Sequence, residues 1–224
     1  MRLACVAALL VACRASSTTP APAEGSAQFA GRPIAQTMSY EGADWLDRES
    51  RADREQPERV LDALKLTRDM VAADVGAGTG YFTLRLAPRV AKVYATDLQP
   101  EMLRMLDARL TQAHVQNVQL ERATEHDAAL PADCCDLVLL VDVYHELSDP
   151  PAVMAGIHKA LHPSGRLVLV EYRAEDPRVH IKPEHKMTLA QIKKELEPMG
   201  FQFLDALEFL PDQHVVELTP VGPP

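Results

Sequence analysis

The chain has 224 residues, of which 23 are lysine or arginine and 32 are aspartate or glutamate, giving a formal net charge of −9. This length is within what one hydrophobic core supports, so we expect one folded domain. The acidic balance repels a phosphate backbone and no basic stripe interrupts it, which excludes nucleic acid as a partner. The cysteines are not a disulfide framework, because two lie in the apolar N-terminal segment and Cys134 and Cys135 are adjacent.

The first thirteen residues, MRLACVAALLVAC, place one positive charge before about ten apolar residues. This run is too short to span a bilayer and is typical of the core of a signal peptide. Residues 10–13 also resemble the bacterial lipobox, whose cysteine is lipidated. We therefore expect 1–13 to be a signal peptide or lipoprotein signal, with membrane anchoring through Cys13 in the second case. The predicted location is the bacterial cell envelope, periplasmic or lipid-anchored, and the cytoplasm if the signal is not real.

The next segment, 14–37, is rich in Ala, Ser, Thr, Pro and Gly and has no apolar period, so it is expected to be a flexible linker. The folded domain is expected to span 38–224. It opens with a helical segment, 44–66, in which a charged first half precedes apolar residues at helical spacing. Pro57 is expected to divide this segment into two short helices.

Buried strands then alternate with amphipathic helices. The predicted strands of the first part are 70–75, 91–96, 115–120, 135–143 and 166–172, and the predicted helices are 100–113 and 150–161. Strands that are apolar throughout are typical of a parallel sheet covered on both faces. A helix over 188–199 and an antiparallel hairpin of 201–209 and 214–218 complete the chain. The fold class is α/β: a Rossmann-like, seven-stranded, doubly wound sheet in the order 3-2-1-4-5-7-6, with the last strand antiparallel and helices on both faces.

A glycine-rich turn, ADVGAGTGY, follows the first strand. Gly76, Gly78 and Gly80 let the backbone turn tightly and approach a ligand. The spacing GxGxG differs from the dinucleotide motif GxGxxG, whose third glycine is replaced by Tyr81. Asp74, two residues before the first glycine, would repel a phosphate but can accept a hydrogen bond from the ammonium group of an amino acid.

A second acid ends the following strand. Asp97 comes 23 residues after Asp74, as expected for one βαβ step. Its carboxylate can accept hydrogen bonds from both hydroxyl groups of a ribose. On neighbouring strands, the glycine turn and this acid together predict a ligand site at the carboxyl edge of the sheet.

Four segments resemble the class I S-adenosylmethionine-dependent methyltransferases, especially the ubiquinone-biosynthesis-like group: ADVGAGTGYF, VYATDLQPEML, LVLLVDVYHEL and LHPSGRLVLVEY. The resemblance covers residues 60–218. The chain is further similar to a bacterial subgroup whose members carry an N-terminal export or lipoprotein signal. The resemblance implies that S-adenosylmethionine is the cofactor.

The same resemblance implies a cofactor site made of the glycine turn and the ends of several strands. Its expected members are Asp74, Gly76, Ala77, Gly78, Thr79 and Gly80 around the methionine part, Asp97 at the ribose, Leu98 and Met102 beside the adenine, Thr124 and Glu125 at the adenine amino group, and Asp142 against the sulfonium.

Methyl transfer from a sulfonium is an in-line displacement, in which the protein aligns the reacting atoms and removes a proton from some acceptors. The candidate catalytic residues are Tyr144, His145 and His185. His145 is either a general base, with Glu146 or Asp142 setting its charge, or a cap of the following turn beside a packing Tyr144. His185 either touches the substrate or caps the helix that follows it.

No metal site is expected. His145, His185 and His214 come from separate elements and lack the local spacing of zinc ligands.

Three functions remain open on the sequence. The first is an S-adenosylmethionine-dependent methyltransferase (EC 2.1.1.-) acting on a small-molecule acceptor by in-line transfer. The second is a non-catalytic exported protein that binds S-adenosylmethionine or a nucleoside, which would explain an export signal on a protein whose cofactor is made in the cytosol. The third, a nicotinamide oxidoreductase, is disfavoured by Tyr81 and by the antiparallel tail.

Overall fold

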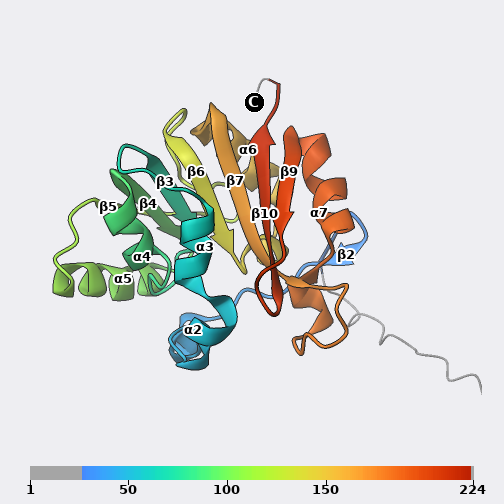
Figure 1. The fold of residues 1–224 in the computed structure, drawn as a ribbon, viewed down its shortest axis with the longest axis horizontal. Coiled ribbons are helices and arrows are strands. Elements are labelled where there is room, and N and C mark those ends of the chain that lie inside the picture. The colour runs from blue at the N-terminus through green and yellow to red at the C-terminus, as the bar shows by residue number, and fades with distance from the viewer. Residues whose placement is uncertain (1–26, 223–224) are drawn as a thin grey trace, which may run out of the picture.

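The computed structural model describes residues 27–222, and the expected signal, Cys13 and most of the expected linker lie outside them. One central sheet carries helices on both faces (Figure 1). The strands are β1 (Gln28–Phe29), β2 (Arg32–Pro33), β3 (Val71–Val75), β4 (Lys92–Asp97), β5 (Val118–Arg122), β6 (Cys135–Val141), β7 (Leu161–Arg173), β8 (Lys186–Met187), β9 (Phe201–Leu207) and β10 (Gln213–Pro220). The α-helices are α1 (Ala43–Leu46), α2 (Ser50–Glu55), α3 (Pro57–Ala63), α4 (Thr83–Leu86), α5 (Pro100–Gln112), α6 (Pro150–Ala160) and α7 (Leu189–Leu196).

The main sheet has the order β5-β4-β3-β6-β7-β10-β9, with β8 pairing beside β7. Counted in chain order without β8, this path reads 3-2-1-4-5-7-6. Pairs among β3, β4, β5, β6 and β7 are parallel, whereas β10 is antiparallel to both of its neighbours. The expected count of seven strands is corrected to eight, because two residues before α7 pair with the end of β7.

The central strands bury both of their faces. In β6, Leu137 and Leu139 pack with α3 and α4 on one side, while Val138 and Leu140 pack with α6 and α7 on the other. All four side chains have no exposed surface. This explains the unbroken apolar run in the sequence, since a strand covered twice has no solvent face.

Capping side chains and a proline start these helices near the positions predicted from the sequence. Asp149 caps α6 through the amide of Ala152, and Thr188 caps α7 through the amide of Gln191. Gln56, in the left-handed conformation, ends α2, and Pro57 begins α3, so the expected division of the N-terminal helical segment is observed. None of the helices that the structure describes is long and apolar enough to cross a membrane.

The described end of the expected linker is folded, which corrects that prediction for residues 27–37. β1 and β2 form a hairpin, and the buried Arg32 guanidinium pairs with the buried carboxylate of Glu195 in α7 at 2.8 Å. Arg32 and the amide of Ala35 also donate to the carbonyl oxygen of His145, each at 3.1 Å. Composition alone does not predict this, because long-range polar contacts and not an apolar period hold the segment.

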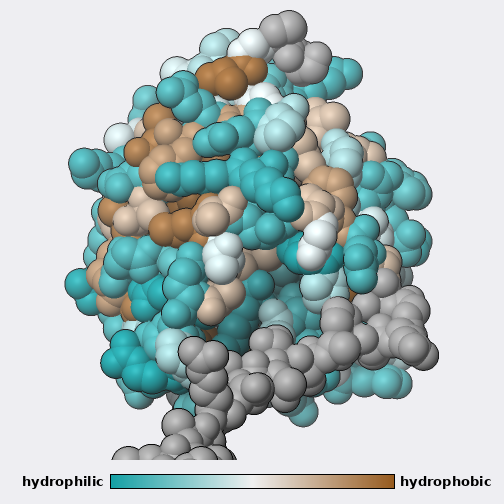
Figure 2. Space-filling view, turned by 90° about the vertical axis from the view of Figure 1, so that its right-hand side faces the viewer, coloured by the Kyte–Doolittle hydropathy of each residue, from teal (hydrophilic) through white to brown (hydrophobic). Residues whose placement is uncertain are grey.

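The surface at the β9 edge mixes polar and apolar side chains without one continuous apolar area (Figure 2). Leu204 in β9 is 49% exposed, and the Lys193 ammonium lies over the ring of Phe203.

Candidate functional site

A cavity of about 780 Å³ opens where the parallel strands end. It is lined by most of the residues predicted to hold a cofactor: Asp74, Gly76, Ala77, Gly78, Thr79, Asp97, Leu98, Met102, Thr124, Glu125 and Asp142. His145 and His185 line the same cavity. The strand ends meet at one edge of the sheet, so Asp74 and His185, 111 positions apart in the sequence, share one space.

Two glycines of the turn are required by geometry. Gly76 has φ +73°, and a Cβ there would lie 2.4 Å from Val143 Cγ2. Gly78 has φ +56°, and its amide donates to Asp97 Oδ2 at 2.9 Å. The glycine turn is thereby fastened to the acid on the next strand, which places both beside the cavity.

Gly80 has a different role from the one expected. It is not among the residues that line the cavity, and a Cβ there would lie 2.2 Å from Leu106 Cδ1 of α5. Its φ of +89° is also one that other residues rarely adopt. Gly80 therefore allows the turn to pack against α5 and does not face the ligand.

Asp74 is buried, and its Oδ2 accepts a hydrogen bond from the Thr83 hydroxyl at 2.5 Å. Burial raises the pKa of Asp74 to about 6, although Thr83 and the nearby Arg51 lower it in part. Thr83 was not predicted, because a threonine one helical turn beyond a glycine motif carries no distinctive signal.

Asp97 presents a fixed carboxylate to the cavity. Its two oxygens accept hydrogen bonds from the amides of Gly78 and Gln99, at 2.9 and 2.8 Å. Burial raises the pKa of Asp97, while the two amides lower it in part. Each oxygen keeps a free lone pair, so acceptance of two ribose hydroxyls remains possible.

Asp142 has φ +54°, and both of its oxygens accept from the side-chain amide of Gln213 in β10, at 2.9 Å. Burial raises the pKa of Asp142 well above its usual value, and the negative charges of Glu55 and Glu171 add to that shift. The carboxylate is thus held at the cavity wall by a residue from the C-terminal hairpin, a contact that no local pattern predicts.

Tyr144 does not line the cavity, which corrects its prediction as a catalytic candidate. The side chain is fully buried, and its hydroxyl donates to Glu195 Oε2 at 2.8 Å. The Arg32 guanidinium lies 5.4 Å from its ring. Burial raises the pKa of Tyr144 well above its usual value, with the Glu195 charge adding to the effect. Tyr144 belongs to the network that fastens β2 to α7.

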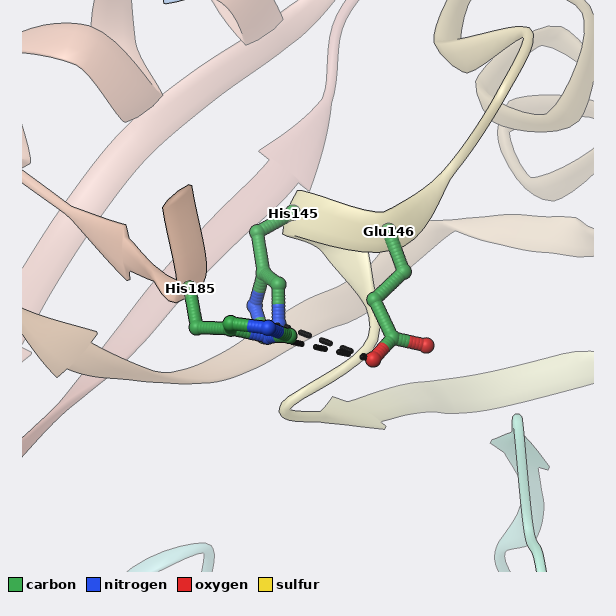
Figure 3. A group of neighbouring side chains, drawn as sticks. All are labelled: His145, Glu146 and His185. Carbon is green, nitrogen blue, oxygen red and sulfur yellow. Dashed lines mark hydrogen bonds and ion pairs between the residues drawn. The ribbon is translucent and has the colours of Figure 1, made fainter. Parts of the chain in front are cut away.

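His145 and His185 are neighbours in the cavity wall, with Glu146 beside them (Figure 3). His145 Nε2 lies 3.0 Å from His185 Nδ1 and 3.9 Å from a Glu146 oxygen, and the opposite nitrogen of His145 lies 2.5 Å from Glu171 Oε2. Thr188, not His185, caps α7. His214 is bonded to Glu208 and Glu175 and does not join this group.

Burial and neighbouring charges shift the pKa values of His145, His185 and Glu146. Burial lowers the pKa of His145, but the adjacent Glu171 more than offsets it, so that the pKa of His145 is raised overall. Burial and the charge of His145 lower the pKa of His185. Burial raises the pKa of Glu146 to about 7.

The N-terminal segment also lines the cavity, a contribution that the sequence analysis did not anticipate. Residues 36–39, Trp45, Leu46 and Arg51 form part of the wall. The Gln99 side chain donates to the carbonyl of Met38 at 2.9 Å and accepts from the amide of Tyr40 at 2.8 Å. These bonds hold the segment across the end of β4.

The residues present fit S-adenosylmethionine. A Cβ at Gly78 would lie only 3.0 Å from Leu46 Cδ1, so the glycine keeps the turn and Leu46, which both line the cavity, from crowding each other. The hydroxyl of Tyr81, a residue of the cavity wall, is buried and has no hydrogen-bond partner within the described residues. Acids at Asp74, Asp97 and Asp142 suit an ammonium group, ribose hydroxyls and a sulfonium.

The family described as "Methyltransferase domain" matches residues 73–169, the stretch that holds the glycine turn, Asp97, Asp142 and His145. Residues 73–169 are therefore similar to methyltransferase domains. The crystal structure of an S-adenosylmethionine-dependent methyltransferase from Aquifex aeolicus superposes with a TM-score of 0.77 and 25% identity, over 83% of this chain and all of that one. S-adenosylmethionine is the cofactor of the domain.

Two curated relatives are similar to part of this chain. A demethylmenaquinone methyltransferase of Tropheryma whipplei is 29% identical over 147 residues, 63% of this chain and 59% of that protein. A ubiquinone biosynthesis O-methyltransferase of Xanthomonas oryzae is 29% identical over 128 residues, 52% of this chain and 54% of that protein. The similarity therefore spans less than two thirds of either relative.

Proposed function

We propose that this protein transfers the methyl group of S-adenosylmethionine to a small-molecule acceptor. The observation that carries the proposal is the composition of one cavity wall. The glycine turn and Asp97 line the cavity. His145, Glu146 and His185 line it too, although they are not needed to bind the cofactor. A single space with two chemically different parts suits a cofactor and an acceptor bound together.

The residues divide the work of binding and alignment. When bound, S-adenosylmethionine supplies a methyl group activated by a sulfonium. Asp97 would accept hydrogen bonds from the ribose hydroxyls and Asp74 from the ammonium group, and the two acids would together orient the cofactor. Asp142 follows β6 and lines the same cavity, where a nearby sulfonium would favour the ionised form of its carboxyl group.

The acceptor is proposed to have an apolar body and a polar reacting end. The cavity wall includes Val141, Val143, Leu147, Tyr172 and Ile181, together with the His145 group. Two relatives are named for methylation in quinone biosynthesis, which agrees with an acceptor of this chemical class. The net charge of −9 also favours a small molecule over a nucleic acid.

The test is isothermal titration of the full chain with S-adenosylmethionine, S-adenosylhomocysteine and NADH at matched salt. We expect the first two to bind and NADH not to bind. Asp97→Ala should weaken S-adenosylhomocysteine binding by about 1.5 to 3 kcal/mol, since a charged acceptor is lost. Asp107→Ala is the matched control, because Asp107 is an exposed acid of α5 outside the cavity wall.

Either of two results would contradict the proposal. Binding of NADH alone would identify an oxidoreductase, and unchanged affinity in Asp97→Ala would place the ribose elsewhere. Binding of the cofactor without methyl transfer to any of a panel of hydroxylated aromatic acceptors would favour the non-catalytic alternative.

We propose, separately, that residues 1–13 direct the chain to the cell envelope. Support comes only from the single positive charge, the apolar run and Cys13. Fractionation of cells expressing the full chain and its Cys13→Ser variant tests this. Recovery of both from the cytoplasm would contradict it.

A further inference from the structure

We propose that His145, His185 and Glu146 form a binding site for a divalent transition-metal ion, with Zn²⁺ as the best match, and that the bound ion holds the hydroxyl oxygen of the methyl acceptor. Metal binding by these three residues does not depend on the proposed function, whereas the role of the ion rests on that function. The three side chains each offer one ligand atom, and these atoms lie within 4.8 Å of one another (Figure 3).

The distances suit one shared ion. His145 Nε2 and His185 Nδ1 are 3.0 Å apart, and the nearer Glu146 oxygen lies 3.9 Å from the first and 4.0 Å from the second. Ligand atoms about 2.0 to 2.2 Å from a tetrahedral zinc ion are about 3.4 Å apart, so shifts of a few tenths of an ångström would complete the site. Two histidines and one glutamate are also the ligand set of some catalytic zinc sites.

Glu171 bonds to Nδ1 of His145, the ring nitrogen that is not proposed to bind the metal. Glu171, which has no exposed surface, accepts from His145 Nδ1 at 2.5 Å and from the amide of Tyr144 at 2.9 Å. The proton of a neutral His145 is therefore on Nδ1, and the lone pair of Nε2 points toward His185. A carboxylate that orients the far nitrogen of a histidine in this way is common around metal sites.

The three ligands come from two turns of the chain, one with His145 and Glu146 and the other with His185. Glu171 lies on β7, and β8 pairs with β7 through Tyr172 and Lys186, which places His185 beside the end of that strand. The turn of His145 and Glu146 follows β6, and its backbone is held by Arg32. Strand pairing and hydrogen bonds thus fix the positions of the ligands, as a metal site requires.

Charge also favours a cation here. Within residues 27–222, no lysine or arginine forms an ion pair with Glu146 or Glu171, and the nearby Asp142 is bonded only to the neutral amide of Gln213. All three metal ligands line the cavity, so a fourth position of the ion would face the acceptor.

The ion would act on a hydroxylated acceptor, such as a phenol. Coordination lowers the pKa of the hydroxyl, whose proton leaves to solvent. The oxygen then forms a bond to the methyl carbon while the carbon–sulfur bond breaks and its electron pair stays on sulfur. The products are an O-methyl ether and neutral S-adenosylhomocysteine.

The first experiment is a Zn²⁺ titration of the chelator-treated full chain against a chromophoric competitor. We expect one tightly bound Zn²⁺ per chain, with affinity at least about tenfold lower in His185→Gln and in Glu146→Gln. His162→Gln is the matched control, since His162 pairs with Asp136 at the opposite end of β7. Wild-type affinity no tighter than that of His145→Gln/His185→Gln, or an equal loss in His162→Gln, would overturn the site.

A second measurement tests the acceptor role and separates the two proposals. The Co²⁺-loaded chain should show visible bands of a four- or five-coordinate ion that shift when phenol is added, and unchanged bands would overturn acceptor coordination. S-adenosylhomocysteine binding should persist in His185→Gln. If the metal binds but S-adenosylhomocysteine does not bind the wild type, the proposed function fails while the metal site stands.

Discussion

Asp74 is a buried acid whose charge depends on what surrounds it. Burial raises its pKa to about 6, above the usual value near 4, so the folded chain holds a proton that the unfolded chain releases between these pH values. Without ligand, this group therefore lowers folding stability as pH rises through that window. A bound ammonium group favours the ionised form, so ligand binding and protonation of Asp74 oppose each other.

From this opposition we predict that S-adenosylhomocysteine binding weakens as pH falls below about 6 and is nearly constant above pH 7. The loss approaches tenfold for each pH unit, the limit for a single proton. Titration calorimetry between pH 5 and 8 measures it. Asp74→Asn cannot ionise and should bind weakly at every pH, so a persistent pH dependence in this variant would assign the effect to another group.

Tyr144 is expected to stabilise the fold without taking part in catalysis. Tyr144→Phe removes a hydrogen bond to the carboxylate of Glu195 and should lower the free energy of unfolding by about 1.5 to 3 kcal/mol. Because the hydroxyl points away from the cavity wall, kcat should stay at the wild-type value. Urea unfolding and initial rates test this pair of effects, and a fall in kcat at unchanged stability would return Tyr144 to the catalytic site.

At the scale of elements, the N-terminal hairpin links the far edge of the sheet to the site. Arg32 in β2 pairs with Glu195 in α7 and donates to the carbonyl of His145, while the next residues continue into the cavity wall at 36–39. The hairpin thereby braces the turn that carries His145. It is too short to be stable alone, so its order depends on these long-range bonds.

We predict that a chain beginning at Met38 is less stable than one beginning at Ala27. Loss of Arg32 leaves Glu195 as a buried charge without its partner, which costs about 3 to 5 kcal/mol. Denaturant unfolding of the two chains measures the difference. A version of the longer chain with Arg32→Ala should reproduce most of the loss. Equal midpoints for both lengths would mean that the hairpin is not part of the domain.

On the scale of the whole molecule, the site is assembled by the topology of the sheet. β3, β4 and β6 end at one edge, which brings Asp74, Asp97 and Asp142 to one cavity. The switch in strand order between β3 and β6 opens the space between them. β9 returns the chain to this edge, where Gln213, the first residue of the antiparallel β10, bonds to Asp142. The acidic cavity wall is therefore a consequence of strand order.

The sequence by itself determined the parallel sheet, the glycine turn and the acids at the strand ends. These features have local causes: apolar runs, glycines with positive φ and an acid at a fixed spacing all follow from neighbouring residues. The sequence therefore predicted that the glycine turn, Asp97 and Asp142 line one cavity, whereas Gly80 packs on Leu106 outside it.

Only the tertiary structure decided the other side of the cavity. The meeting of His145 with Glu171, Glu146 and His185, and the exclusion of Tyr144, depend on how three distant segments pack. Residues 40 positions apart show no periodic signal, so their chemistry appears only when the sheet brings them together. Buried polar contacts of this kind, including Arg32 with Glu195, are fixed by long-range geometry and not by local propensity.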